Sequence, residues 1–548
     1  MIYTSDPAPP VPQLDLLSLL FDSQYCLAAE DTVLHTDAAN PSNGITKAAA
    51  RILTRRIASA LRELGIGKHG SGKDVVVVVS AGQRMLPILF YAVIAAGGVA
   101  SQASASFKPE ELARQIQQGS AKLCISCPAT KPLLVAAAQL SGVPDDRCLV
   151  LDSFQPRWCL HMLADPSARN IVGETELDWE RVTSQEKLEN SVICLLYSSG
   201  TTGPPKGVIM SHTNLVWSAF ITGLRLRDHW EKEGRWDYRT LAHLPAAHIA
   251  GVQGYFVIPF YNGGTTYWMP KFDFMDFLKY NRALEITTFF TVPPIYVLIN
   301  KAPFVTDQFR TLKAATGGAA PLGKELQISV SNKLGVFLAQ TWGLSETTGS
   351  VTGGDVNIED TSGSVGPLLP HCKLRLVDDD GKDCPPNVPG EVLVHGPLVT
   401  KGYYNNPEAN AGSFKDGYLC TGDIGVFKDG RLHIVDRKKE LIKYKGLQVA
   451  PAELEAVLID HPKILDAGVI GVYDENEATE VPRAYVVVSE QAPVSAKEIQ
   501  DFVKSRLASH KQLRGGVVFV PAIPKSASGK ILRKDLREMA KSGPKAKL

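Results

Sequence analysis

Up to about Gly363, the chain alternates between segments with helical hydrophobic spacing and short runs that are apolar throughout. Residues 46–64 place apolar side chains three or four positions apart, which predicts a helix that ends at Gly65. Residues 75–79 are all valine and predict a buried strand. Strands that alternate with helices of this length favour an α/β architecture of doubly wound parallel sheets. The same spacing predicts helices over residues 86–96, 109–118 and 131–140, and strands over residues 122–126 and 148–151.

After Gly363 the pattern changes to short β-like runs separated by glycine and proline. Such runs are typical of a small β-barrel or of a distorted antiparallel sheet, and our prediction is the small β-barrel. The runs cover residues 374–377, 390–395 and 432–435.

A charged run, Asp436–Glu440, precedes a last segment that has its own strand and helix patterns. An ordinary solvated linker would have the same composition as this run. We predict an N-terminal domain over residues 1–436 and a small, mobile α+β C-terminal domain over residues 437–548. Its expected strands are residues 441–444, 467–472, 483–489 and 517–520, and its expected helices are residues 452–459 and 496–507.

The richest chemistry lies in residues 197–207, between apolar runs at 192–196 and 208–210 that predict strands. The segment reads Tyr-Ser-Ser-Gly-Thr-Thr-Gly-Pro-Pro-Lys-Gly, with three glycines, four Ser/Thr hydroxyls and Lys206. Free backbone amides, hydroxyls and one cation suit a polyphosphate. An ordinary P-loop is excluded, because it opens a helix with Gly-Lys-Ser/Thr and two prolines occupy that place here.

Composition and charge exclude several classes of protein. A net charge of +1 over 548 residues gives no global field to attract nucleic acid, so an anion site must be local. Nine cysteines, an odd number without repeated spacing, argue against a disulfide framework and fit a reducing compartment. The amino end lacks the pattern of a secretory signal. The longest apolar run, residues 86–100, is too short to span a bilayer, so we expect a soluble protein without a transmembrane segment.

The order Ser-Ser-Gly-Thr-Thr-Gly-x-Pro-Lys-Gly resembles the phosphate-binding signature of the adenylate-forming superfamily, which includes acyl-CoA synthetases, 4-coumarate:CoA ligases, beetle luciferases and peptide-synthetase adenylation domains. The resemblance is strongest to the acyl-CoA synthetase and 4-coumarate:CoA ligase branch, particularly over residues 436–455. Five more motifs follow in the expected order, at residues 244–251, 317–321, 340–346, 421–423 and 524–534.

This resemblance implies that the cofactors and substrates are ATP, Mg²⁺, coenzyme A and a carboxylic acid. It implies catalytic roles for Lys530, His248 and Glu346. Nucleotide contacts are implied for Ser198, Ser199, Gly200, Thr201, Thr202, Gly203, Lys206, Ala319, Gln340, Thr341, Trp342, Ser345, Asp423, Arg437, Lys439, Lys443, Gln448 and Lys530. Acid contacts are implied for Ala247, His248, Ile249, Gly317 and Gly318, coenzyme A contacts for Lys271, Lys445 and Gly446, and metal ligation for Glu346 with Thr202.

The implied reaction is an acid:CoA ligation through an acyl-adenylate, with AMP and diphosphate released. In the family the small domain rotates between the two half-reactions, which places a hinge at Lys439 and presents residues 443–446 to the nucleotide. Three alternatives remain open at this point. They are a luciferase-like oxygenase, a stand-alone adenylation enzyme that feeds a carrier protein, and a non-catalytic binding protein.

The last three residues, Ala546-Lys547-Leu548, resemble the peroxisomal address Ser-Lys-Leu. We therefore expect recognition by the peroxisomal import receptor, and a cytoplasmic location otherwise.

Overall fold

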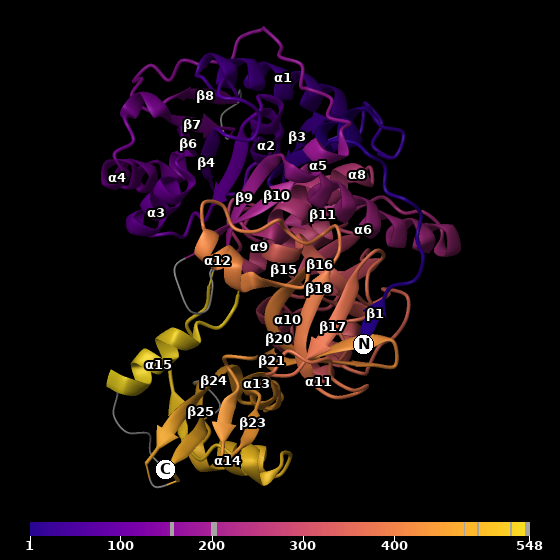
Figure 1. Ribbon diagram of the computed structural model, residues 1–548, viewed down its shortest axis with the longest axis vertical. Helices are drawn as coiled ribbons and strands as arrows, with labels where there is room; N and C mark the ends of the chain where they lie inside the picture. Colours follow the sequence, from indigo (N-terminus) through magenta and orange to yellow (C-terminus); the bar gives the residue numbers. More distant parts are fainter. Residues whose placement is uncertain (154–157, 199–204, 476, 490–492, 527–528, 543–548) are drawn as a thin grey trace.

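The computed structural model describes residues 1–153, 158–198, 205–475, 477–489, 493–526 and 529–542. Figure 1 shows the amino-terminal half at the top, an orange β-rich region in the middle and the carboxy-terminal unit at the bottom. None of the described helices combines the length and hydrophobicity needed to cross a membrane.

A seven-stranded sheet, in the order β10-β9-β5-β4-β6-β7-β8, forms the first layer. Its inner strands run parallel, and β10 and β8 are antiparallel edges. Five valines make β4 completely buried, as the sequence predicts for a central strand covered on both faces. The strands are β4 Val75–Val79, β5 Val99–Ala103, β6 Leu123–Ser126, β7 Cys148–Asp152, β8 Cys159–Met162, β9 Val192–Ser198 and β10 Lys206–Ser211; the helices are α1 Lys47–Glu63, α2 Leu86–Ala95, α3 Pro109–Gly119, α4 Lys131–Ser141 and α5 Gln185–Asn190.

Two four-stranded sheets follow, in the orders β11-β12-β2-β3 and β13-β14-β15-β16. Together with the first sheet they confirm the predicted doubly wound α/β architecture. Their strands are β2 Val33–Asp37, β3 Asn40–Thr46, β11 Arg239–Ala242, β12 Thr265–Trp268, β13 Thr288–Thr291, β14 Ala314–Gly317, β15 Leu338–Leu344 and β16 Gly349–Gly353. The helices are α6 His212–Glu233, α7 Ile249–Gly251, α8 Ile258–Tyr261, α9 Phe274–Ala283, α10 Pro293–Lys301 and α11 Lys324–Leu334.

The predicted small β-barrel is wrong, because these strands form an open antiparallel sheet in the order β1-β17-β18-β20-β19, with β21 also on β20. The reason lies in β20 Tyr418–Lys428, which is long enough for β19 to pair with its first residues and β21 with its last. Both partners thus share one side of β20, and the ladder ends there. The other elements are β1 Ile2–Thr4, β17 Lys373–Val377, β18 Gly390–His395, α12 Pro407–Ser413, β19 Phe414–Lys415 and β21 Arg431–Arg437.

The carboxy-terminal unit has the predicted α+β composition and its own apolar core, in which Leu454, Val469 and Ile499 are fully buried. A β22–β23 hairpin precedes a three-stranded sheet, β24-β25-β26. The elements are β22 Ile442–Tyr444, β23 Leu447–Val449, α13 Pro451–Ile459, β24 Ile464–Asp474, β25 Thr479–Val488, α14 Ala496–Lys504, β26 Val517–Phe519 and α15 Arg533–Ser542. The boundary between the two domains and the mobility of the C-terminal domain stay predictions.

Candidate active site

Lys530 reaches the large N-terminal region from a turn just before α15. Its backbone N–H donates to Ser526 Oγ at 3.2 Å, and its carbonyl accepts from the N–H of Ser526 at 2.8 Å. Gly529 has φ +80°, and a Cβ there would lie 3.4 Å from carbon atoms of Pro294 and Val292. Glycine therefore suits the left-handed backbone, while a Cβ would meet the start of α10 only at an ordinary van der Waals distance.

Four charged or titratable side chains interact electrostatically with the Lys530 ammonium. Burial, followed by the positive charge of Arg437, lowers the pKa of Lys530 to about 8, while Glu346 and Asp423 act in the opposite direction. Burial and the Lys530 charge also lower the pKa of His248 to about 4. Near pH 7 the site therefore holds a charged lysine beside a neutral histidine.

Asp423 and Arg437 face each other because they are register partners on β20 and β21. Asp423 is 5% exposed, accepts a hydrogen bond from Trp342 Nε1 at 2.9 Å and lies 3.5 Å from Arg437 Nε. Burial raises the pKa of this carboxyl, although Arg437 opposes the rise. Lys439 lies in the same charged group, since burial and Arg437 lower its pKa. Trp342 packs into the apolar cluster of the open sheet, and its stacking on adenine stays a prediction.

Glu346 sits in a short 3₁₀ turn that follows β15. Its Oε1 accepts hydrogen bonds from Ser198 Oγ at 3.1 Å and from the Tyr403 hydroxyl at 2.9 Å. Lys206 Nζ lies 4.9 Å from the centroid of the Tyr403 ring. The end of β9 thus meets the turn after β15 at one carboxylate, although Ser198 and Glu346 are far apart in sequence. The start of β10 lies beside the same Tyr403 ring.

The donor set is compatible with magnesium. Mg²⁺ takes one or two protein carboxylates and completes its shell with water and phosphate oxygens. No group of three or more His, Cys, Asp or Glu side chains suited to a metal occurs in the described part of the chain, so an all-protein cage is absent there. Glu346 would supply the single carboxylate. The predicted second ligand, Thr202, lies outside the described residues, as do Ser199, Gly200, Thr201 and Gly203.

Next to these groups is a cavity of about 310 Å³. Ala319 adopts φ +69°, an uncommon conformation for a residue with a Cβ, in the turn after β14. A Cβ on Gly318 would lie 2.9 Å from the carbonyl oxygen of Thr341, so β14 and β15 approach closely there. The predicted residues Gly317 and Ala247 do not line the cavity themselves, but each is next in sequence to a residue that does. The predicted site residues that line the cavity are His248, Ile249, Ala319, Gln340, Thr341, Ser345 and Lys530.

Sequence reasoning missed the α6 side of the cavity. Thr222, Arg225, Asp228 and Lys232 line it, and their spacing of three or four places them on one helical face. That spacing is the only signal in the sequence that groups these four residues. Without knowledge of the fold, a polar face of a helix is expected to face solvent.

A model of the AMP-binding enzyme family matches residues 29–404, and a model of the AMP-binding enzyme C-terminal domain matches residues 453–530. The chain belongs to the AMP-binding enzyme family. It is 50% identical to a protein of Emericella nidulans provisionally named an acyl-coenzyme A synthetase, over 98% of each chain. It is 35% identical to a 4-coumarate–CoA ligase of Nicotiana tabacum, over 91% of this chain and 90% of that one.

Among solved structures, ATP-bound MatB from Rhodopseudomonas palustris has a TM-score of 0.82 and 27% identity, over 96% of this chain and 99% of that one. These findings confirm the acyl-CoA synthetase branch predicted from the motifs. The chain is an AMP-forming acid:CoA ligase that acts through an acyl-adenylate.

Several predicted contacts of this acid:CoA ligase do not reach the cavity in the structure. Lys443, Lys445, Gly446 and Gln448 are exposed on the β22–β23 hairpin, and Lys445 pairs with a glutamate of its own unit. Lys271 is also exposed. Gly446 has φ +82°, so any larger residue would strain the hairpin turn whatever space surrounds it.

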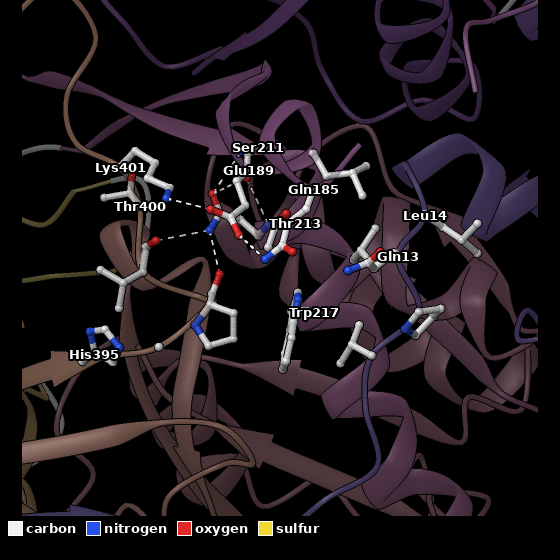
Figure 2. Close-up of a pocket in the computed structure, with 18 of the residues that line it drawn as sticks. Gln13, Leu14, Gln185, Glu189, Ser211, Thr213, Trp217, His395, Thr400 and Lys401 are labelled. Atoms are coloured by element: carbon white, nitrogen blue, oxygen red, sulfur yellow. Dashed lines mark hydrogen bonds and ion pairs between the residues drawn. The ribbon is translucent and has the colours of Figure 1, made fainter. Parts of the chain in front are cut away.

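The ligase has a second cavity, of about 600 Å³, shown in Figure 2. Residues 11–14, α5, the start of α6 and residues 395–401 line it. Asn214, 3% exposed, donates from Nδ2 to the carbonyls of Pro397 at 2.9 Å and Val399 at 3.3 Å. Next along the chain, the N–H of Thr400 donates to the main-chain carbonyl of Glu346 at 2.8 Å. This cavity wall is therefore bonded to the turn that carries the candidate metal ligand.

Proposed function

We propose that both half-reactions take place at the cavity that Lys530 enters. A carboxylate oxygen attacks the α-phosphorus of ATP and diphosphate leaves, which forms the acyl-adenylate. The sulfur of coenzyme A then attacks the acyl carbon, the thiol loses its proton and AMP leaves. The observation that carries this proposal is that Lys530, which lines the cavity, interacts with Glu346 and Asp423 from two other distant parts of the chain.

In the first step two anions must approach each other, which makes fixed positive charge at the point of contact the main requirement. The Lys530 ammonium would bridge the carboxylate and the α-phosphate. Its partly buried position supports this role, because a charge shielded from water acts more strongly. Glu346 would hold Mg²⁺, whose charge offsets that of the phosphates. Mg²⁺ is thus proposed as a cofactor.

Asp423 and Arg437 suit the ribose. The Asp423 carboxylate can accept hydrogen bonds from two ribose hydroxyls, and its bond to Trp342 holds it in place. Neutral His248 would line the cavity and offer a hydrogen bond to the acid, without a second positive charge that competes with Lys530 for the carboxylate.

For the second step we propose that residues after Lys439 rotate, withdraw Lys530 and bring the β22–β23 hairpin to the nucleotide. In the structure Lys530 lines the cavity while the hairpin is exposed to solvent. These two observations support an arrangement that serves adenylation only. Coenzyme A would then pass Gly446. Rigid-body rotation of this kind is a common use of a hinge.

The test separates the half-reactions with Lys530→Ala. Removal of the bridging charge should slow adenylation, measured by acid-dependent ATP–diphosphate exchange, by about 10²–10³. Thioester formation from supplied acyl-adenylate should persist. Lys534→Ala is the matched control, because Lys534 is 78% exposed on α15. Equal loss of both half-reactions in Lys530→Ala, with the Lys534 variant active, would contradict the proposed role.

We also propose a peroxisomal location, on the basis of Ala546-Lys547-Leu548 alone. These residues lie outside the described part of the chain.

A further inference from the structure

Tyr403 contacts both charged groups that the site offers to a phosphate and its metal, although it lies outside every motif read from the sequence. Its hydroxyl donates to Glu346 Oε1 at 2.9 Å, and Lys206 Nζ lies 4.9 Å from the centroid of its ring. Tyr403 is only 8% exposed, so its hydroxyl and ring are largely shielded from water. One buried side chain therefore connects the carboxylate of the site with the lysine at the start of β10.

The backbone of Tyr403 is fixed on two sides, which allows its side chain to position other groups. The Asn410 side chain, in α12, accepts a hydrogen bond from the N–H of Tyr403 at 2.7 Å and donates to its carbonyl at 3.1 Å. The next residue pairs with β10, because the N–H of Tyr404 donates to the carbonyl of Gly207 at 2.8 Å. The segment that carries Tyr403 is thus bonded to the strand that begins with Lys206.

Both of the hydrogen bonds that the Glu346 carboxylate accepts within the described residues end on the same oxygen. Ser198 Oγ and the Tyr403 hydroxyl donate to Oε1, which leaves Oε2 as the oxygen for a metal ion. Partners that hydrogen-bond to a metal ligand commonly account for about 10–100-fold of metal affinity. Burial, followed by the negative charge of Glu346, raises the pKa of Tyr403, so the hydroxyl keeps its proton and remains a donor to Glu346.

The ring of Tyr403 gives Lys206 a contact other than the carboxylate. Within the described residues Lys206 forms no ion pair, although the tyrosine that it lies over is bonded to Glu346. A direct pair of these two charges would neutralise the cation meant for a phosphate and the anion meant for a metal. An aromatic face attracts an ammonium and leaves its charge and its N–H donors in place. Lys206 over the ring is therefore still able to bind a phosphate.

We propose that Tyr403 is a positioning residue of the phosphate site: its hydroxyl fixes Glu346 for the metal, and its ring holds Lys206 apart from that carboxylate until MgATP binds. This inference rests on the proposed function, because it takes Glu346 as the ligand of Mg²⁺ and Lys206 as a contact of the phosphates.

The experiment measures by calorimetry the Kd of the full-length enzyme for MgATP, for ATP in EDTA and for AMP in EDTA. Tyr403→Phe keeps the ring and removes the hydroxyl. It should raise Kd for MgATP by about tenfold or more, because the metal ligand loses a partner. Both metal-free nucleotides should bind as they do to the wild type, because Lys206 keeps its place over the ring.

Tyr403→Leu removes the ring as well as the hydroxyl, so Lys206 can turn toward Glu346. Kd for ATP in EDTA should then rise by about threefold or more, in addition to the rise for MgATP. AMP lacks the two outer phosphates and should bind as before.

Tyr404→Phe is the matched control, because it removes the hydroxyl of the adjacent tyrosine. The Tyr404 ring packs against the apolar cluster of the seven-stranded sheet, so all three values of Kd should stay at their wild-type level. Circular dichroism checks that each variant is folded. If Tyr403→Leu does not fold, the result for Tyr403→Phe decides.

Three results would overturn the inference and leave the proposed function standing, provided that the wild type binds MgATP. They are an unchanged Kd for MgATP in Tyr403→Phe, an equal rise for MgATP and AMP, which would indicate a general loss of structure, and an equal rise for MgATP and metal-free ATP, which would refute a role toward the metal. A wild-type enzyme that binds none of the three nucleotides would overturn the inference and the proposed function together.

Discussion

The alkaline limit of adenylation should be set by Lys530. Its pKa is lowered from 10.5 to about 8, by burial first and by the charge of Arg437 second. The first half-reaction uses the Lys530 ammonium, the protonated form. Adenylation activity is therefore retained below pH 8 and lost as the pH rises through this value. With a pKa of about 8, the protonated fraction is roughly one tenth at pH 9, whereas an unperturbed lysine would still be almost fully protonated.

The assay is acid-dependent ATP–diphosphate exchange from pH 6 to 10, analysed as kcat/KM because this ratio reports the pKa values of the free enzyme. We expect about a tenfold fall between pH 7 and pH 9. Arg437→Gln removes the positive charge beside Lys530, so the alkaline fall in kcat/KM should move to higher pH. The maximal kcat/KM should also be lower, because the proposed ribose contact is lost. Circular dichroism at each pH excludes unfolding as the cause. A wild-type profile that stays flat to pH 10 would refute the reasoning, because either the pKa of Lys530 is not lowered or its charge does not act in adenylation.

Three further predictions concern the cavity wall, the hinge and the carboxy terminus. Asn214→Ala removes two hydrogen bonds to half-buried carbonyls beside Thr400, so it should lower the free energy of unfolding by about 1–3 kcal/mol and raise KM for MgATP through the Thr400–Glu346 bond, as measured by urea denaturation and steady-state kinetics; unchanged values of both would contradict this. Lys439→Pro should retain diphosphate exchange but accumulate enzyme-bound acyl-adenylate that coenzyme A discharges slowly, because proline restricts φ, with Lys439→Ala as the control for loss of charge; wild-type thioester formation would argue against the hinge. A fluorescent protein that ends in the last dozen residues should enter peroxisomes, and the same fusion without Leu548 should stay diffuse; a diffuse intact fusion would remove the peroxisomal proposal.

A tryptophan substitution at Gly446, which coenzyme A is proposed to pass, is a poor test of the second half-reaction. Glycine at φ +82° is needed by the hairpin turn itself, so a loss of thioester formation would not distinguish a blocked passage from a distorted turn. Lys439→Pro avoids this problem, because it restricts the backbone at the proposed pivot and leaves the hairpin sequence intact.

Much of this protein follows from the sequence by itself. The valines of β4, the helical spacing of α1 and the runs of the carboxy-terminal unit predict their elements closely, because apolar runs and a 3.6-residue period depend on neighbours along the chain. The glycine-rich loop and the later motifs indicate the family for a similar reason: a phosphate loop is a local arrangement of glycines, hydroxyls and a lysine.

Tertiary structure decides what depends on distance. The sequence pattern did not predict β20, whose length lets it hold two partners on one side, so the sheet stays open instead of closing into a barrel. Arg225 has the appearance of a solvated helical residue until α6 packs beside β16 and turns it into a cavity wall. The low pKa of Lys530 likewise arises only when Arg437 and the cavity surround it, because desolvation and charge interactions act through space and not along the chain.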